Sequence, residues 1–264
     1  MRERDMLQRE LKQAVKTEAI VPFYQPVMDL RSNQIIGFEA LARWSHPVLG
    51  EIPPTRFIAI AEDCGLIAPL TDQLLARACA DAMSWPAHLT LSFNLSPLQL
   101  KDRTLGLRVL SILAKAGLSP SRLELELTES ALVRDLSAAQ EVLASLRAAG
   151  VRLALDDFGT GYSSLYHLRN FKVDKIKIDR SFVAEMQTEP ESAALVRALL
   201  GLGHGLGLTV TAEGIEQGQQ STELLSAGCD FGQGFLFGRA VPAAEALALL
   251  RQQQPAAIAM AAAG

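Results

Sequence analysis

Acidic side chains recur along this 264-residue chain where short apolar, strand-like runs end or are interrupted. A single acid at such a point usually caps a helix or forms an ion pair. Several acids around one ring are different, because like charges at short range repel unless cations neutralise them. No histidine is among them, so the donors are hard oxygen atoms, which favour Mg²⁺ or Mn²⁺ over zinc or copper. The polar residues at these positions are Glu39, Asn94, Glu126, Glu129, Asp156, Asp157, Lys177, Glu213 and Gln233.

The adjacent pair Asp156 and Asp157 is the most informative of these positions. Such a pair suits two ions that share a bridging carboxylate, about 3.5–4 Å apart, and two-metal sites of this kind commonly serve in-line displacement at phosphorus. The glycines that follow, Gly159 and Gly161, are typical of a mobile strand-to-helix loop and equally of a plain turn. The pair therefore predicts phosphoryl chemistry assisted by divalent cations.

The elements that must position these residues alternate between strand-like and helix-like patterns. The apolar, strand-like runs are Phe23–Leu30, Ile35–Ala42, Leu89–Leu95, Leu123–Leu127, Val151–Leu155, Val173–Ile178, Leu208–Ala212 and Gly232–Phe237. The stretches with helical periodicity are Arg56–Cys64, Thr71–Met83, Leu105–Ala116, Leu136–Ala149, Ser192–Leu202, Gln217–Ala227 and Ala243–Gln252. Eight strands with intervening helices over this length predict an α/β protein with a (β/α)₈ barrel, and a doubly wound open sheet is the alternative fold.

Three further features refine this prediction. Residues 30–33 look like a turn, so the first two strands are predicted to form an antiparallel hairpin, which departs from a regular barrel. A barrel also brings the C-terminal ends of its strands to one rim, where the polar residues would meet. The glycines at positions 201, 203, 205 and 207 follow a helix and precede a strand, the reverse of the order in a dinucleotide site, so we interpret them as helix termination.

Composition bounds the kind of protein. Hydrophobic residues make up 49% and charged residues 20%, so a full core can form. The net charge is −4, which leaves no overall basic field and argues against a nucleic-acid polymer as partner. The cysteines, Cys64, Cys79 and Cys229, lack ligand spacing and are interpreted as buried thiols in a reducing compartment.

The ends of the chain differ from its middle. Leu7, Leu11 and Val15 fall on one face of a charged N-terminal helix, which either docks on the barrel or arrives from an upstream signalling domain. We expect this linker or signalling helix over residues 1–18, the barrel over 19–254 and a flexible tail over 255–264. No apolar run reaches the roughly 18 residues of a membrane helix and the N-terminus is too charged for a signal peptide, so we expect a cytoplasmic chain.

Short motifs in this order resemble those of the EAL-domain cyclic di-GMP phosphodiesterases. The resemblance runs from about Ala19 to Pro242, and no catalytic position departs from the family pattern. The motifs that carry it are Tyr24-Gln25-Pro26, Glu39-Ala40-Leu41 with Arg43, Asn94 in FNLS, Glu126-Leu127-Thr128-Glu129, Asp156-Asp157-Phe158-Gly159-Thr160-Gly161, Lys177-Ile178-Asp179, Ala212-Glu213-Gly214-Ile215-Glu216 and Gln233-Gly234-Phe235.

The resemblance implies a modified TIM-type barrel with one antiparallel strand, and it implies roles for individual residues. Glu39, Asn94, Glu126 and Asp156 resemble the ligands of a first metal ion, and Asp156, Asp157 and Glu213 those of a second. Lys177 resembles the residue that contacts the attacking water, and Glu129 the anchor of the loop from Asp157 to Gly161. Gln25, Arg43 and Gln233 resemble substrate contacts, with Glu216 and Asp179 as supporting groups nearby.

The resemblance further implies metal-dependent hydrolysis of cyclic di-GMP to linear 5′-pGpG by a water that two ions activate. Mg²⁺ or Mn²⁺ would support the reaction and Ca²⁺ would inhibit it. A homodimer formed near the loop from Asp157 to Gly161 is implied, as is an upstream sensor or GGDEF domain. The chain would then be cytoplasmic or the cytoplasmic part of a larger membrane protein.

Two other functions remain open at this point. The first is a receptor that binds cyclic di-GMP without turnover, although such receptors usually lack some metal ligands, which this chain retains. The second is an enzyme for another phosphodiester, such as a linear or a hybrid cyclic dinucleotide. For Lys177, a general-base role, a positioning role and a structural salt bridge with a ring carboxylate all remain open.

Overall fold

The computed structural model describes residues 2–128, 136–159 and 171–261, and its strands form one closed barrel. Eight strands close the barrel and β3 lies outside it, paired with β2. The strands are β1 (Ile20–Asp29), β2 (Gln34–His46), β3 (Gly50–Ile52), β4 (Thr90–Asn94), β5 (Leu123–Thr128), β6 (Arg152–Phe158), β7 (Lys175–Ile178), β8 (Thr209–Ala212) and β9 (Phe231–Gly232). The predicted barrel is confirmed, and the open-sheet alternative is wrong.

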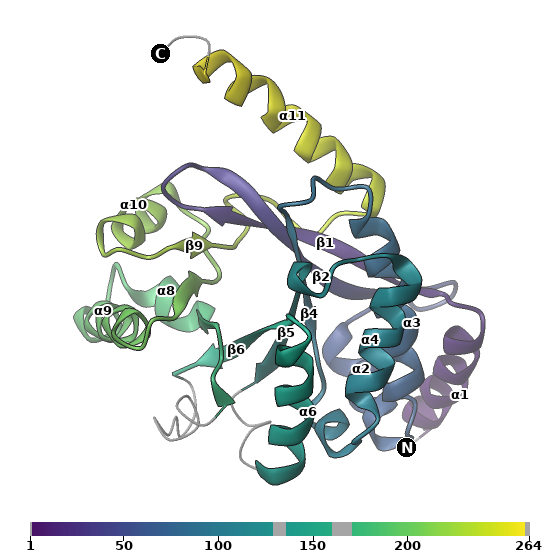
Figure 1. The fold of residues 1–264 in the computed structure, drawn as a ribbon. Helices are drawn as coiled ribbons and strands as arrows, with labels where there is room; N and C mark the ends of the chain where they lie inside the picture. Colours follow the sequence, from purple (N-terminus) through teal and green to yellow (C-terminus); the bar gives the residue numbers. More distant parts are fainter. Residues whose placement is uncertain (1, 129–135, 160–170, 262–264) are drawn as a thin grey trace.

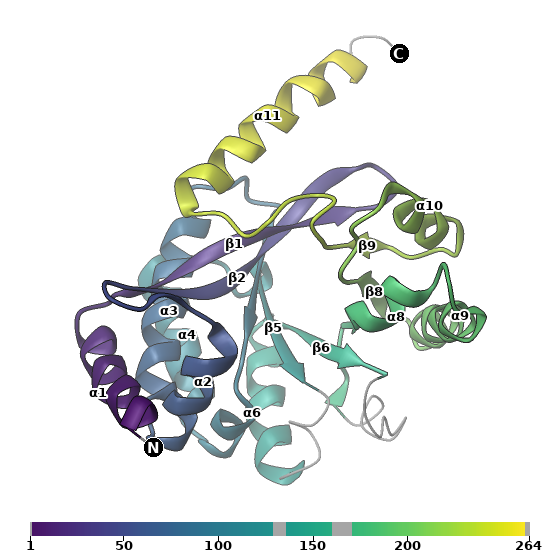
Figure 2. The ribbon, with the colours of Figure 1, turned by 180° about the vertical axis from the view of Figure 1, so that it is seen from behind.

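The strand β1 runs against the rest of the barrel. It pairs antiparallel with both of its neighbours, β2 and β9, whereas the other pairs around the barrel are parallel. The predicted hairpin between the first two strands is therefore confirmed. Figures 1 and 2 show this long hairpin crossing one side of the barrel.

Helices cover the outside of the barrel (Figure 1). The helices α1, α2, α3, α4 and α6 lie together on one side, and α8, α9 and α10 lie on the other, as Figure 2 shows from behind. The helices are α1 (Arg2–Lys16), α2 (Pro54–Asp63), α3 (Ile67–Ala82), α4 (Leu105–Ala116), α6 (Leu136–Ala148), α8 (Arg180–Glu185), α9 (Pro190–Gly205), α10 (Gly218–Ser226) and α11 (Ala243–Ala261), with short 3₁₀ turns η1 (Pro97–Lys101) and η2 (Pro120–Arg122). Within the described residues, no helix is long and apolar enough to span a bilayer.

The N-terminal helix docks on the barrel's outer layer. Leu7 and Leu11 of α1 are fully buried in the same core cluster as Phe57 and Ile60 of α2. Burial of this apolar stripe stabilises α1 against the body of the protein. The structure thus shows α1 docked on the barrel, which is one of the two alternatives predicted for this helix. The boundary at residue 18 stays a prediction.

Several elements differ from their predicted form: β3 and α8 were not predicted, and three other differences concern the end of the chain and α9. The last strand is not Gly232–Phe237 but only β9, because the chain turns after Gln233 and Gly234 packs on the backbone of Ile215. The helix α11 continues to Ala261, through part of the segment predicted as a tail. The helix α9 runs through three of the four clustered glycines, and only Gly207 lies beyond its end, with a left-handed φ of +74°.

One of these glycines is a packing site. A Cβ added to Gly203 would lie 2.6 Å from Val210 Cγ2 and 3.1 Å from Ile176 Cδ1, so α9 approaches the barrel closely here. Gly201, two residues earlier in the same helix, has open space around it.

We expect Gly203→Ala to lower the free energy of unfolding by about 1–3 kcal/mol, because the added methyl overpacks the contact between α9 and the barrel. Gly201→Ala is the matched control and should raise it by up to about 1 kcal/mol, since alanine favours the helix. Urea unfolding of both variants measures the difference. Equal stabilities would contradict this packing of α9.

Candidate active site

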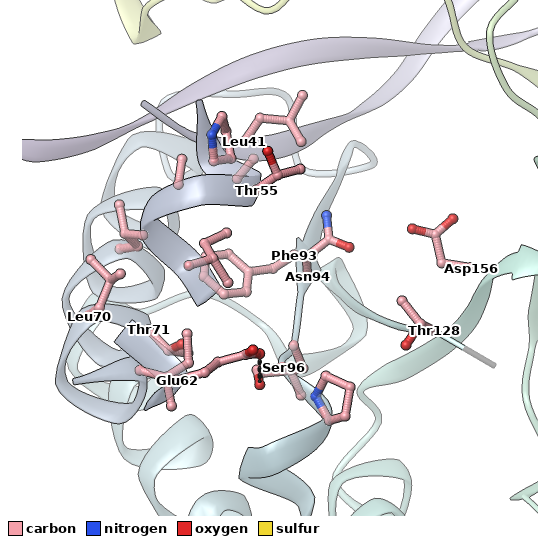
Figure 3. Close-up of a pocket in the computed structure, with 18 of the residues that line it drawn as sticks. Leu41, Thr55, Glu62, Leu70, Thr71, Phe93, Asn94, Ser96, Thr128 and Asp156 are labelled. Atoms are coloured by element: carbon pink, nitrogen blue, oxygen red, sulfur yellow. Dashed lines mark hydrogen bonds between the residues drawn. The ribbon is translucent and has the colours of Figure 1, made fainter. Parts of the chain in front are cut away.

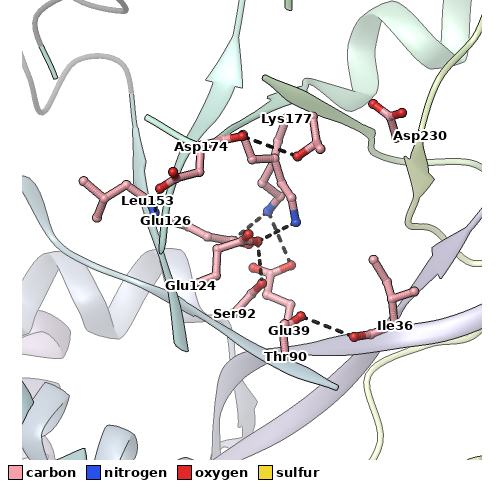
Figure 4. A network of polar contacts seen from close by, with 12 residues as sticks. Ile36, Glu39, Thr90, Ser92, Glu124, Glu126, Leu153, Asp174, Lys177 and Asp230 are labelled. Carbon is pink, nitrogen blue, oxygen red and sulfur yellow. Dashed lines mark hydrogen bonds and ion pairs between the residues drawn. The ribbon is translucent and has the colours of Figure 1, made fainter. Parts of the chain in front are cut away.

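A buried lysine lies at the centre of the acidic rim. The amine of Lys177, on β7, is 2.7 Å from Glu126 Oε2 and 2.6 Å from Glu213 Oε1. It also lies 3.5 Å from Asp156 Oδ1 and 3.7 Å from Glu39 Oε2. Figure 4 shows this amine pointing toward Glu126 and Glu39 inside the barrel. The structure therefore brings together predicted residues from β2, β5, β6, β7 and the segment after β8.

The carboxylate of Glu39 is held from two sides. Asn94 Nδ2 donates a 2.5 Å hydrogen bond to Glu39 Oε1, and Gln233 Nε2 donates a 2.6 Å hydrogen bond to Oε2. Each carboxylate oxygen of Glu39 keeps a further lone pair, and the side-chain oxygen of Asn94 stays available as a ligand atom for a cation. This arrangement fits the predicted roles of Glu39 and Asn94 as metal ligands.

A β-bulge presents the adjacent aspartates to the rim. The register of β6 against β7 shifts between Leu155 and Phe158, so Asp156 and Asp157 lie opposite the single residue Lys177. Asp157 has a left-handed φ of +54°, and its amide donates a 3.0 Å hydrogen bond to Asp156 Oδ1. Neighbouring side chains of a regular strand point to opposite faces, and the bulge removes that constraint.

The aspartate pair and Glu213 form a candidate cation site. One carboxylate oxygen each from Asp156, Asp157 and Glu213 lie within 4.8 Å of one another. Oxygen donors at this spacing fit a hard divalent cation, as the sequence predicts. Glu39, Glu126 and Asp156 all lie within 4 Å of the Lys177 amine, so the residues of the two predicted ligand sets are adjacent.

The charges of this cluster are unbalanced. Burial would lower the pKa of Lys177, but the carboxylates around it, Glu126 and Glu213 first, raise it well above its usual range, so its amine carries a charge. Burial raises the pKa of Glu213 to about 8, with a further rise from Asp156 that Lys177 opposes. Burial also raises the pKa of Glu126 well above its usual range, with Glu39 adding to it.

The same imbalance extends to Asp157, whose pKa is raised by burial and by the charges of Asp156 and Asp179. Glu39 is the exception, because Lys177 and the hydrogen bonds from Gln233 and Asn94 outweigh its burial and lower its pKa. Glu126, Asp157 and Glu213 thus hold their protons more strongly than free carboxyl groups do, and a divalent cation would displace those protons. The residues present therefore fit the predicted metal site.

An apolar cavity of about 500 Å³ opens beside the cluster. Figure 3 shows Asn94, Thr128 and Asp156 at one end, with Leu70 and Thr71 at the other. The wall between them comes from β2, α2, α3 and β4 and includes Leu41, Pro54, Ile58 and Phe93. The cavity joins an apolar surface to the acidic rim, a combination typical of small-molecule sites.

The predicted substrate contacts lie on the β1–β2 hairpin and after β9. Arg43 is on the same face of β2 as Glu39 and Leu41, because every second residue of a strand shares a face. Its Nη1 donates a 2.9 Å hydrogen bond to the Ala42 carbonyl, and its guanidinium lies 5.9 Å from the centre of the Phe23 ring. Gln25 lies opposite Glu39 in the hairpin, so it reaches the cluster from the neighbouring strand.

The remaining predicted residues border the cluster, lie apart from it or fall outside the described residues. Asp179 caps α8 by accepting a 3.0 Å hydrogen bond from the Ser181 amide, beside Asp157. Glu216 is exposed and lines a separate hollow with Arg180 and Gln217. Glu129 and positions 160 and 161 of the predicted loop lie outside the described residues, and the anchoring role of Glu129 stays a prediction.

A second ionic layer lies deeper in the barrel. Lys175 Nζ is 2.7 Å from Glu124 Oε1, which also accepts a 3.0 Å hydrogen bond from Ser92 Oγ. Glu124 and Lys175 are two residues before Glu126 and Lys177, on the same faces of β5 and β7. The alternation of charged and apolar residues in LELEL and KIKI places Glu124 and Lys175 on the same faces as Glu126 and Lys177. Glu124 and Lys175 could therefore have been predicted to point into the barrel, but only Glu126 and Lys177 were.

Fold and rim together define a TIM-type barrel with one antiparallel strand and, at one end, an acidic cluster that could hold a metal ion. The chain matches the EAL domain over residues 8–240 and belongs to that family. An uncharacterized signaling protein of Caulobacter vibrioides is 48% identical over 92% of this chain and 30% of its own length. The cyclic di-GMP phosphodiesterase RocR of Pseudomonas aeruginosa is 38% identical over 83% of this chain and 57% of its own length.

Solved structures agree with this assignment. The PaMucR phosphodiesterase in complex with c-di-GMP superposes with a TM-score of 0.87 at 40% identity, covering 91% of this chain and 99% of that one. The chain spans about a third of the length of several curated relatives that it matches.

The raised pKa of Glu213 predicts a pH dependence of stability. Its folded pKa of about 8 exceeds the usual 4.5, so the metal-free fold binds more protons than the unfolded chain between these values. The metal-free melting temperature should therefore fall as the pH rises through this window, and the increase caused by Mg²⁺ should grow. Differential scanning fluorimetry with and without Mg²⁺ at pH 6–8.5 measures both.

The matched variant is Glu213→Gln, which cannot ionise and should make the metal-free curve less steep, with Glu126 and Asp157 leaving a smaller slope. A metal-free melting temperature that stays level over this range in the wild-type protein would contradict the charge imbalance described here.

Proposed function

We propose that this chain hydrolyses cyclic di-GMP to linear 5′-pGpG in a reaction that needs two Mg²⁺ or Mn²⁺ ions. The observation that carries the proposal is the buried Lys177 ringed by carboxylates beside an apolar cavity. RocR is named a cyclic di-GMP phosphodiesterase, and PaMucR, the phosphodiesterase solved with c-di-GMP, is 40% identical to this chain. These likenesses favour turnover over a receptor role. The chain also keeps the full set of predicted metal ligands, some of which such receptors usually lack.

The ions would be held by the two adjacent ligand sets. Glu39, Asn94, Glu126 and Asp156 would hold one ion, and Asp156, Asp157 and Glu213 the other. When bound, such ions lower the pKa of water and offset negative charge on the phosphate oxygens. Two of these ligands, Asp156 and Asp157, come from one bulge, so the bulge sets how close the two ligand sets lie.

Lys177 and Arg43 supply the positive charges of the protein itself. The protonated amine of Lys177 donates hydrogen bonds, so it is placed to orient the attacking water or a phosphate oxygen over the acids it contacts. In the metal-free fold the raised pKa of Lys177 favours this positioning role over a role as general base, and two bound cations would oppose that rise. Arg43, half-buried on β2, offers guanidinium donors to a phosphodiester.

The cavity would take one nucleobase of the substrate. Its apolar wall includes Leu41, Pro54 and Phe93, and its polar end contains Asn94 and Asp156. A base packed on this wall would hold a phosphodiester over the acidic rim, and this fixes the reacting phosphorus near Lys177. The substrate needs only these local contacts, so the negative net charge of the chain is no obstacle.

The organisation of the whole protein is also proposed. We propose a barrel over residues 19–254, preceded by a helix that links it to an upstream sensor or GGDEF domain. A homodimer formed beside the loop that follows Asp157, and a cytoplasmic location for the barrel, complete this proposal. The docking of α1 on α2 supports a path for signals into the wall of the cavity, since α2 forms part of that wall.

Chromatography of cyclic di-GMP after incubation with the protein tests the function. Mg²⁺ or Mn²⁺ should give a single product, 5′-pGpG, and Ca²⁺ should give none. Ca²⁺ prefers 6–8 oxygens at 2.3–2.6 Å, which would misplace the attacking water. Binding without turnover in Mg²⁺ would indicate a receptor, cleavage of other dinucleotides in preference would indicate another substrate, and equal turnover in Ca²⁺ would contradict the two-ion site.

Lys177→Met should lower kcat by roughly 10²-fold or more, the scale of positioning and acid–base contributions. Affinity for cyclic di-GMP in Ca²⁺ should change much less, because the ions and Arg43 hold the phosphate. The matched control is Lys175→Met, which also breaks a buried ion pair, with Glu124, but one layer deeper.

Both variants should melt at lower temperature, because each leaves a buried carboxylate without its partner. Only Lys177→Met should lose turnover per folded molecule. A near-wild-type kcat for Lys177→Met would mean that Lys177 forms a structural salt bridge and has no role in catalysis.

A further inference from the structure

The segment after β9 folds back onto β1 at Gln25. Gln25 Nε2 donates a 3.1 Å hydrogen bond to the Gly238 carbonyl, and Gln25 Oε1 accepts a 3.3 Å hydrogen bond from Gln233 Nε2. One side chain thus joins the beginning and the end of this turn. Gly238 also packs beside the next residue of β1, since an added Cβ would lie 3.2 Å from Pro26 Cγ.

The side chain that Gln25 holds is itself buried. Gln233 is 4% exposed, and its backbone is fixed by a 2.9 Å bond from its amide to the Ala212 carbonyl and a 3.0 Å bond from the Ile215 amide to its carbonyl. Its Nε2 group donates to both Gln25 Oε1 and Glu39 Oε2. The position of this amide therefore depends on Gln25 on one side and Glu39 on the other.

The contacts continue to the acidic rim. Glu39 Oε2 accepts the 2.6 Å hydrogen bond from Gln233, and Glu39 Oε1 accepts the 2.5 Å hydrogen bond from Asn94. Glu39 and Gln25 are also opposite each other in the β1–β2 ladder, so one hairpin carries both ends of the chain of contacts. With both oxygens fixed, the plane of the Glu39 carboxylate is set before any ligand binds.

We propose that Gln25 is a positioning residue for the cation that Glu39 holds, acting through Gln233. The proposal rests on the metal dependence proposed above. It differs from the substrate-contact role that the family resemblance implies for Gln25, because both polar atoms of the Gln25 amide are bonded within the protein. Hydrogen-bond partners of metal ligands typically contribute 10–100-fold to metal affinity.

Calorimetric titration of the substrate-free protein with Mn²⁺ tests this inference without relying on turnover. Gln25→Leu should raise the Mn²⁺ concentration at half-saturation by about 10-fold, and Gln233→Leu by at least as much. The double variant should match Gln233→Leu alone, because Gln25 acts only through Gln233. The matched control is Gln34→Leu, which removes an amide from the far end of the same hairpin and should bind Mn²⁺ as the wild type does.

The outcomes separate this inference from the proposed function. If wild-type protein binds no Mn²⁺, the metal dependence itself is wrong. If it binds Mn²⁺ and Gln25→Leu binds equally well but holds cyclic di-GMP more weakly in Ca²⁺, Gln25 is a substrate contact and the positioning role is wrong. Additive losses in the double variant would also contradict it. Should Gln25→Leu fail to fold, Gln25→Asn keeps the amide but is too short to reach both partners, and the same losses are expected.

Discussion

The excess of carboxylates at one end of the barrel is the constraint on which the rest of the site depends. Lys177 contacts Glu126 and Glu213 directly and has Asp156 and Glu39 close by, yet it can neutralise only one charge. Because burial and the remaining carboxylates disfavour further negative charge, the pKa values of Glu126 and Glu213 are raised. A fold that keeps such a cluster is suited to divalent cations, which would supply the missing positive charge and would activate the attacking water.

The barrel creates this cluster through two local departures from regular geometry. The bulge in β6 turns Asp156 and Asp157 toward the same rim, which a regular strand would not do. The antiparallel β1 places Gln25 opposite Glu39, so the hairpin supports the cluster from the side. Beneath it, the Glu124–Lys175 pair fills the next layer with a balanced ion pair, which confines the charge excess to the open end beside the cavity.

Much of this arrangement could be predicted from the sequence, because the strands alternate with helices and their C-terminal ends carry the polar residues. The barrel, its hairpin and the meeting of Glu39, Glu126, Asp156 and Lys177 follow from that pattern. The bulge could not be predicted, since aspartate tolerates a left-handed φ better than most residues but does not specify one at Asp157. The contacts of Gln25 and the early end of β9 also depend on how the segment after β9 packs on Ile215 and Pro26, which periodicity does not record.

Anomalous diffraction from crystals of the protein grown with Mn²⁺ tests the central claim most directly. The account predicts two manganese peaks at the rim, both within ligand distance of Asp156, one also bound by Glu39 and Glu126 and the other by Asp157 and Glu213. A single peak, peaks elsewhere on the protein, or none at saturating Mn²⁺ with Lys177 still bridging the carboxylates would contradict it.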